Sequence, residues 1–263
     1  MPSLCATFRK EAGVVWNRMR TAAQLGLALS EETLTECSLY NIALVHQGAE
    51  IVIDLATKPA EAKHGADWEW WFIRSGKGVG FRVQAKRLFA AGQYNSLLKS
   101  GKDPYEQLDK LVQASAKEGL EALYCFYNFS HPLGNFAGPN PCRHAYRASS
   151  FWGCSLAFPD QVKNSATNQL AKLRPIMHPW HTLVCGKGKI DAIANGFIRE
   201  VGGRDSPPGP RDLPSRVHRL ISLGELRKGS PTYRGYLDDS YWQDESDVPD
   251  GLAGLISFRD NRD

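Results

Sequence analysis

The segment that decides the fold is a run of aromatic and β-branched residues divided by a glycine-rich turn. It reads GADWEWWFIR over residues 65–74, SGKGVG over 75–80 and FRVQAKRL over 81–88. Aromatic and β-branched side chains favour strands, and a glycine-rich turn between two such runs is typical of a β-hairpin. We therefore expect these residues to form two neighbouring strands.

Upstream of this hairpin the sequence predicts two helices and a strand. Apolar residues recur near helical spacing over residues 11–29. Ser30 is a favourable N-cap for a second helix, whose first turn carries Glu31 and Glu32, where the helix dipole favours acids. The stretch EIVIDL at 50–55 alternates and is rich in β-branched residues, which indicates a strand.

Downstream, helices and strands continue to alternate. Asp103 and Pro104 supply an N-cap and a first-turn proline for a helix to about Lys117, and LEALYCFYNF at 120–129 indicates a strand. Weaker signals indicate a loop at 131–150 and then a strand, a helix and a short strand, at residues 151–158, 161–173 and 181–185. This order favours an α/β or α+β fold with a mixed sheet flanked by helices.

Composition places the chain among folded globular proteins. Of its 263 residues, 42% are hydrophobic and 23% are charged, which excludes the disordered class. A proline- and glycine-rich run, GGRDSPPGPRDLP, begins at Gly202 and indicates a linker. We therefore expect a core domain with N-terminal helices over residues 1–202 and an acidic C-terminal extension over 203–263.

The net charge of +4 conceals an uneven distribution. Residues 1–190 hold 22 Lys/Arg and 15 Asp/Glu, whereas residues 191–263 hold 10 and 13. A basic body permits a polyanionic partner, and an ordinary solvated surface explains the same counts. Charge alone therefore identifies no function.

Signals for export or for a membrane span are not evident. Arg9, Lys10 and Glu11 stand where a signal peptide needs its apolar run, and no stretch approaches the ~18 apolar residues that cross a bilayer. Six scattered cysteines without a CxxC pair are typical of reduced thiols. We expect a cytoplasmic protein with no membrane partner.

The hairpin also carries the residues with the clearest chemistry. Side chains two apart on a strand point to the same side, so Asp67 and Glu69 share a face of the first strand, as do Gln84 and Lys86 of the second. Pairing of the strands brings an acid, an amide oxygen and an ammonium group to one patch. Carboxylate and amide oxygens bind Mg²⁺, and a lysine orients water and stabilises phosphate charge.

This arrangement resembles a known signature. GAD at 65–67, then a strand, a turn and QAK at 84–86, is similar to the active-site motif of the PD-(D/E)XK (restriction-endonuclease-like) nuclease superfamily. More narrowly it resembles the variant of Mrr-type restriction enzymes, in which Gln replaces the middle acid. The GADWEWW…QAK pattern also resembles an uncharacterised bacterial family that shares an upstream element, here ETLT at 32–35. The resemblance covers roughly residues 30–190, and the last seventy residues only loosely.

The resemblance implies a restriction-endonuclease-like mixed sheet and a role for each matching residue. Asp67 would bind metal at the start of the second core strand, Gln84 would face the metal through its amide oxygen, and Lys86 would position the attacking water. Many members add a glutamate from the first core helix, for which Glu32 is the candidate. Ala66 stands where the superfamily has its proline.

A neutral Gln84 leaves the expected site with less negative charge than its relatives have. Glu32, Glu69 or Glu61 would then complete it. The implied catalytic residues are Asp67, Gln84, Lys86 and Glu32, and the implied ligands of Mg²⁺ or Mn²⁺ are Asp67, Gln84, Glu32 and Glu69.

These implications favour a metal-dependent nuclease that hydrolyses phosphodiester bonds of DNA in prokaryotic restriction or anti-phage defence. A homodimer or an activating protein partner would suit such an enzyme. The alternatives are a non-catalytic nucleic-acid- or protein-binding module on the same fold, and a toxin-like or scaffold protein whose partner recognises the tail.

Two other groups of residues have competing interpretations. The segment 178–185 (HPWHTLVC), with Cys142, has zinc-ligand residue types, but it lacks tight Cys/His pairs and favours core or capping roles. Trp68, Trp70 and Trp71 have the chemistry to stack on bases, but aromatic residues of a central strand are more often core.

Overall fold

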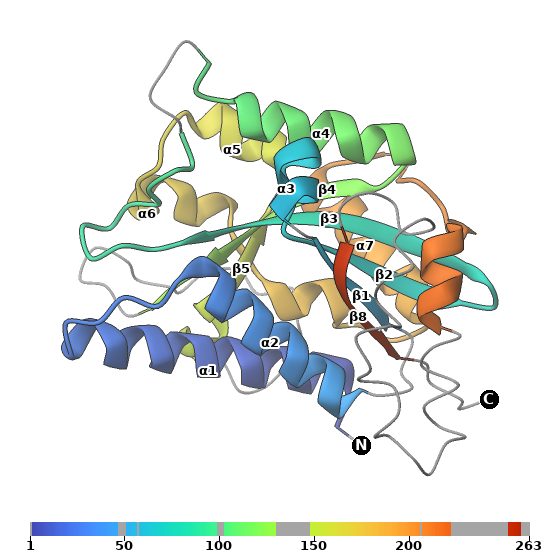
Figure 1. Ribbon diagram of the computed structural model, residues 1–263, viewed down its shortest axis with the longest axis horizontal. Helices are drawn as coiled ribbons and strands as arrows, with labels where there is room; N and C mark the ends of the chain where they lie inside the picture. The colour runs from blue at the N-terminus through green and yellow to red at the C-terminus, as the bar shows by residue number, and fades with distance from the viewer. Residues whose placement is uncertain are drawn as a thin grey trace.

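The computed structural model describes residues 2–46, 51–56, 58–98, 103–129, 148–205, 207–221 and 252–258. Within these ranges the chain forms one mixed eight-stranded sheet with helices on both faces (Figure 1). The strands follow the order β6-β5-β4-β3-β2-β1-β8, and β7 pairs with β3. The expected α+β fold, a mixed sheet flanked by helices, is confirmed.

The predicted hairpin forms the centre of this sheet. β2 (Trp68–Arg74) and β3 (Lys77–Arg87) pair antiparallel along their whole common length. Ser75 and Gly76 make the turn with positive φ values of 50° and 78°. A two-residue turn with both residues in this region matches the twist of the strands it joins, and glycine adopts it at no steric cost.

The remaining strands extend the sheet on both sides of the hairpin. β1 and β8 add antiparallel strands beyond β2, while β4 lies parallel to β3 and β5 and β6 follow antiparallel. The bounds are β1 (Ile51–Ala56), β4 (Glu121–Tyr127), β5 (Cys154–Ala157), β6 (His178–Pro179), β7 (Arg211–Asp212) and β8 (Leu252–Phe258).

Helices cover the sheet and connect its strands. α4 crosses over between the parallel strands β3 and β4, on the opposite side of the sheet from α1 (Figure 1). The helices are α1 (Leu4–Gln24), α2 (Glu31–Val45), α3 (Lys58–His64), α4 (Glu106–Glu118), α5 (Pro159–Ser165), α6 (Leu170–Leu173) and α7 (Ile190–Gly202).

The two faces of the hairpin differ in chemistry. Trp68 and Trp70 point toward the apolar core, where the Trp70 ring centroid lies 5.7 Å from that of Phe8 on α1 and 5.9 Å from that of Trp180. Trp68, Trp70 and Trp71 are 0% exposed, which confirms that they are core residues. The opposite face carries the polar side chains and packs against α4.

Several sequence expectations need correction. The helix expected at 161–173 is two short helices, because Ala166 ends α5 in a left-handed conformation with a φ of 48°. The strand expected at 181–185 is a 3₁₀ helix, Trp180–Val184, whose residues are all buried. A short buried apolar run fits either structure, so the pattern could not distinguish them.

The expectation of six reduced cysteines is also wrong. Cys185 is disulfide-bonded, whereas the free cysteines among the described residues are Cys5, Cys37, Cys125 and Cys154. Cys142 lies outside the described residues.

Residues beyond position 202 join the core. β7 pairs with Lys77 and Gly78 of β3, and the helical segment 215–221 follows it. A second apolar cluster forms where this segment packs on the sheet, and it consists of Val52, Trp71, Ile73, Leu120, Leu213, Val217 and Leu220. β8 then extends the sheet beyond β1.

The described helices lack the features of a membrane span. None of them combines the length and the apolar character that crossing a membrane requires.

Candidate functional site

The hairpin and α2 bring four polar residues together at one end of β3. We call Asp67, Gln84, Lys86 and Glu31 the Asp67 site. Asp67 directly precedes β2 and is held there by its backbone N–H, which donates to the carbonyl of Val83 (2.8 Å). Strand alternation then places Gln84 and Lys86 on the polar face.

The Asp67 carboxyl group is bound by two donors. Its Oδ2 accepts hydrogen bonds from Gln84 Nε2 (2.6 Å) and from the Ala85 backbone N–H (2.5 Å). Burial raises the pKa of Asp67 to about 7, although the Ala85 N–H and the Lys86 charge act to lower it. Glu31 and Glu61 raise it further by repulsion, so three carboxyl groups interact around this point.

Gln84 is enclosed and points in a defined direction. It is 1% exposed, and its Oε1 accepts a hydrogen bond from Gln107 Nε2 on α4 (2.7 Å). Gln107 was not found from the sequence, because only the docking of α4 on the sheet brings it there. The donor end of the Gln84 amide therefore faces Asp67, and its acceptor end faces α4.

Lys86 has a glutamate of α2 beside it. Its Nζ lies 3.8 Å from Glu31 Oε1, and Glu31 Oε2 accepts from the Arg87 backbone N–H (2.9 Å). Burial raises the pKa of Glu31, while the charge of Lys86 acts to lower it. The two contacts hold Glu31 at the end of β3.

The structure places Glu31, rather than the predicted Glu32, beside Lys86. Glu32 is exposed, and its charge acts to raise the pKa of Glu31. Thr35, one turn after Glu31, bonds to the Tyr127 hydroxyl of β4 (2.9 Å), so this stripe of α2 faces the sheet. Glu36, four residues after Glu32, is exposed as well. This spacing of two charged residues is the sequence pattern that indicates a solvent-facing side of α2 at Glu32.

Glu69 lies on the same face as Asp67, as expected, but has different neighbours. It accepts hydrogen bonds from Arg82 Nε (2.7 Å), Arg216 (2.9 Å) and the Trp71 indole N–H (3.1 Å). Glu118 of α4 bonds both arginines as well. We call the five residues that meet here the Arg82 cluster: Asp54, Glu69, Arg82, Glu118 and Arg216. Two arginines thus neutralise Glu69.

The donor types at the Asp67 site fit a divalent cation. Carboxylate and amide oxygens are the ligands that Mg²⁺ and Mn²⁺ prefer, and Asp67, Glu31 and Gln84 supply them. Among the described residues, no three His, Cys, Asp or Glu side chains form a ready metal-binding group. The Gln84 oxygen, which accepts from Gln107 in this structure, would add a third oxygen ligand to the two carboxylates.

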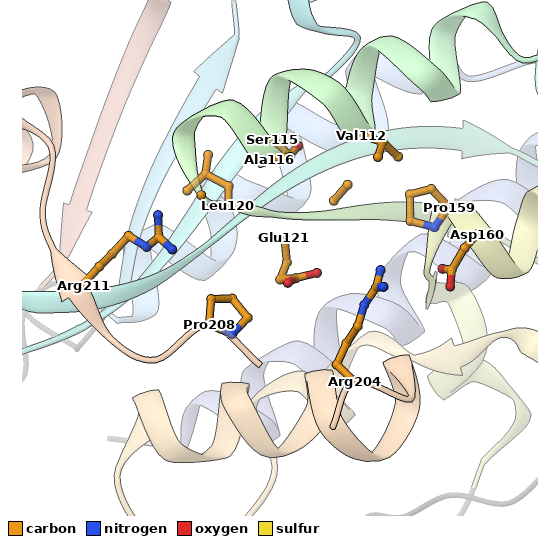
Figure 2. A pocket seen from close by; sticks show the side chains of 12 residues that line it. Val112, Ser115, Ala116, Leu120, Glu121, Pro159, Asp160, Arg204, Pro208 and Arg211 are labelled. Atoms are coloured by element: carbon orange, nitrogen blue, oxygen red, sulfur yellow. The ribbon is translucent and has the colours of Figure 1, made fainter. Parts of the chain in front are cut away.

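A separate cavity of about 380 Å³ lies at the other end of β4 (Figure 2). It is lined by Leu120, Glu121 and Ala122 at the start of β4, whereas Lys86 pairs with Phe126 near its end. Figure 2 shows Glu121 and Arg204 pointing into it from opposite sides. The cavity is therefore not part of the Asp67 site.

Comparison with known proteins places the chain in a family. No curated protein matches its sequence. A family model matches residues 4–262, nearly the whole chain, and thus both the hairpin and the segments that pack against it. The protein belongs to the family described as Family of unknown function (DUF6615).

Proposed function

We propose that this protein is a metal-dependent nuclease that hydrolyses phosphodiester bonds of DNA, acting in the prokaryotic cytoplasm in restriction or anti-phage defence. One observation carries the proposal. Asp67, Gln84 and Lys86 lie on the polar face at one end of the hairpin, and Glu31 of α2 lies beside Lys86. This acid, amide and lysine arrangement is the one that the PD-(D/E)XK resemblance implies.

Each residue of the Asp67 site has a role that follows from its chemistry. A bound Mg²⁺ or Mn²⁺ ion would neutralise phosphate charge and acidify a water molecule. Asp67, Glu31 and the Gln84 amide would hold the ion through their oxygen atoms. Lys86 Nζ would donate a hydrogen bond to the attacking water or to a phosphate oxygen.

DNA as the substrate is supported by the charge of the body of the chain. Residues 1–190, which contain the whole Asp67 site, carry 22 basic and 15 acidic residues. Lys and Arg side chains attract the phosphate backbone, so binding should weaken as salt rises. A homodimer or an activating protein partner would allow both strands to be cut.

The test is cleavage of plasmid and linear DNA with Mg²⁺ or Mn²⁺, with an RNA substrate in parallel. Wild type and Glu69→Gln should cleave, because Glu69 belongs to the Arg82 cluster, whereas Asp67→Ala should not. Equal cleavage by wild type and Asp67→Ala would reject the proposal. Folding of each variant is checked by circular dichroism.

A matched pair on α2 tests which glutamate serves the site. Glu31→Gln should lower the cleavage rate about 10–100-fold, the usual cost of disturbing the surroundings of a metal. Glu32→Gln removes the same charge one residue along the helix and should change the rate less than about twofold, since exposed polar positions contribute little. The reverse order would assign the role to Glu32.

A second candidate function, a non-catalytic nucleic-acid-binding module, has one observation in its favour. Asp67 Oδ2 is satisfied by Gln84 and the Ala85 N–H without any cation. Such a module would bind DNA in a salt-dependent manner and leave it intact. Tight binding that is insensitive to salt would count against it, and cleavage that needs Asp67 would exclude it.

A further inference from the structure

Gln107 on the first turn of α4 contacts both halves of the hairpin motif. Its Nε2 donates to Gln84 Oε1 (2.7 Å). Its backbone oxygen lies against Gly65, where a Cβ atom would be only 2.9 Å away. Gly65 has a φ of 69°, so glycine meets both the backbone conformation and the close approach of the helix. This contact fixes Gln107 relative to Asp67, which lies two residues after Gly65.

The Gln84 amide has one acceptor end and one donor end, and both need partners. Because Gln84 is 1% exposed, bulk water does not reach them, and partners within the protein are needed. In the structure Oε1 accepts from Gln107, while Nε2 donates to Asp67 Oδ2 (2.6 Å) and to the Ala85 carbonyl (3.2 Å). Every polar atom of this side chain is therefore paired.

This orientation suits a site without a cation. The Gln84 N–H group faces the Asp67 carboxylate, and a cation placed between them would meet a donor where it needs an oxygen. A half-turn of the Gln84 amide exchanges its two ends. Gln107 is also an amide, so a matching half-turn lets it accept from Gln84 Nε2, and the hydrogen bond between the two glutamines survives.

We propose that Gln107 is a positioning residue that sets which end of the Gln84 amide faces Asp67, and that the two amides turn together when a divalent cation binds. The proposal rests on the cation requirement of the proposed function. Gln107 itself needs no contact with the ion or with DNA. Its role is to give the buried Gln84 a hydrogen-bond partner in either orientation.

The test is the affinity of the protein for Mn²⁺, measured by calorimetry without DNA. Gln107→Glu places an acceptor where Gln107 now donates, so it should favour the orientation with the Gln84 oxygen toward Asp67. Mn²⁺ should then bind about tenfold more tightly, at the lower end of the effect of residues that orient metal ligands. Gln107 is half-buried in the first turn of α4, where an acid suits the helix dipole, so the variant should fold.

Two controls separate orientation from added charge. Gln113→Glu adds the same charge at an exposed position of α4 and should leave the affinity unchanged. In a Gln84→Glu background, Gln107→Glu should bring no gain, because a carboxylate at position 84 presents oxygen on both sides and loses its donor. An equal gain in both backgrounds would overturn the proposal, as would no gain with Gln84 present.

The outcomes also distinguish this inference from the proposed function. If wild type binds Mn²⁺ with the expected dependence on Gln107 but leaves DNA intact, the nuclease proposal fails and the positioning role stands. If wild type cleaves DNA and the Gln107 variants bind Mn²⁺ as wild type does, the positioning role alone fails. If wild type binds no Mn²⁺, both are overturned.

Discussion

The Asp67 site and the Arg82 cluster lie on the same face of the same hairpin, yet they are built differently. At the Arg82 cluster, Arg82 lies across the strand pair from Glu69 and bonds it at 2.7 Å. At the Asp67 site the corresponding neighbour is the neutral Gln84, and Lys86 Nζ is 3.8 Å from Glu31 Oε1. The cross-strand neighbour thus decides whether an acid is neutralised.

The titration of the acids reflects this difference. Burial acts to raise the pKa of Glu118, but its bonds to Arg82 and Arg216 outweigh burial and lower that pKa overall. At the Asp67 site burial dominates, and it raises the pKa of both Asp67 and Glu31. Within the Arg82 cluster, Glu69 and Glu118 are matched by two arginines as in a structural ion-pair network, whereas burial raises the pKa of the third acid, Asp54. At the Asp67 site the charges of Asp67 and Glu31 are incompletely matched, as the proposed function would require.

The largest effect is expected at the Asp67 site, and it is a loss of DNA cleavage. Lys86→Met should lower the rate of DNA cleavage by about 10²–10³-fold, the usual cost of removing one hydrogen-bond donor that stabilises charge in the transition state. The control is Lys110→Met on α4, whose exposed pair with Glu106 is far less important. Full activity in Lys86→Met would show that Lys86 has no role in cleavage.

The next largest effect is expected at the Arg82 cluster, and it is a loss of stability. Arg82→Met removes the central cation of the Arg82 cluster and leaves Glu69 poorly compensated; the two side chains are 4% and 8% exposed. Breaking such a buried pair costs about 3–5 kcal/mol of unfolding free energy, which urea denaturation measures. Cleavage per folded molecule should not change. A stable but inactive Arg82→Met variant would show that cleavage requires Arg82, and that the Arg82 cluster and the Asp67 site act as one site.

Sequence patterns predicted the hairpin and its faces because these depend on local alternation. The glycine-rich turn and the aromatic runs predict β2 and β3, and alternation puts Asp67, Gln84 and Lys86 on one side. The partners contributed by other elements were not predictable in this way. Gln107 reaches Gln84 only because α4 docks on that face, and this docking depends on contacts distant in sequence.

The same dependence on contacts distant in sequence explains why the sequence did not distinguish Glu31 from Glu32. Ser30 caps α2 by accepting from the Thr33 N–H (3.0 Å), as the sequence predicts, and so puts both Glu31 and Glu32 in the first turn. The cap sets where the helix begins but not which stripe faces the sheet. The Thr35 bond to Tyr127 sets that rotation, and it joins residues 92 positions apart.

A pH effect on stability is expected from Asp54 in the Arg82 cluster. Asp54 is 1% exposed, and neither of its carboxylate oxygens has a hydrogen-bond partner; Arg216 Nε lies 3.9 Å away. Burial, followed by repulsion from Glu69, raises its pKa from 3.8 to about 8, against the opposing charges of Arg216 and Arg82. The folded protein therefore holds a proton that the unfolded chain releases above about pH 4.

The sign of the effect follows from this difference. Between the two pKa values the folded state binds more protons, so stability falls as pH rises, by up to about 1.4 kcal/mol per pH unit for one group. Asp54→Asn should make the slope between about pH 5 and pH 7 shallower by up to that amount, as measured by urea denaturation at each pH. Asp67, whose pKa is also raised by burial, keeps its own contribution to the slope. An unchanged slope would show that Asp54 is ionised in the folded protein.

The smallest effect compares two glycines at the two ends of β2. Gly65 and Gly76 both have positive φ, 69° and 78°, so alanine at either position costs about 1–2 kcal/mol of backbone strain. Only at Gly65 would the added Cβ meet another element, the Gln107 backbone oxygen at 2.9 Å; at Gly76 nothing lies within 4 Å. Gly65→Ala should therefore destabilise more than Gly76→Ala and should also slow cleavage, because the clash displaces α4 from Gln84. Equal losses of stability with unchanged cleavage would mean that the contact between α4 and Gly65 does not position the Asp67 site.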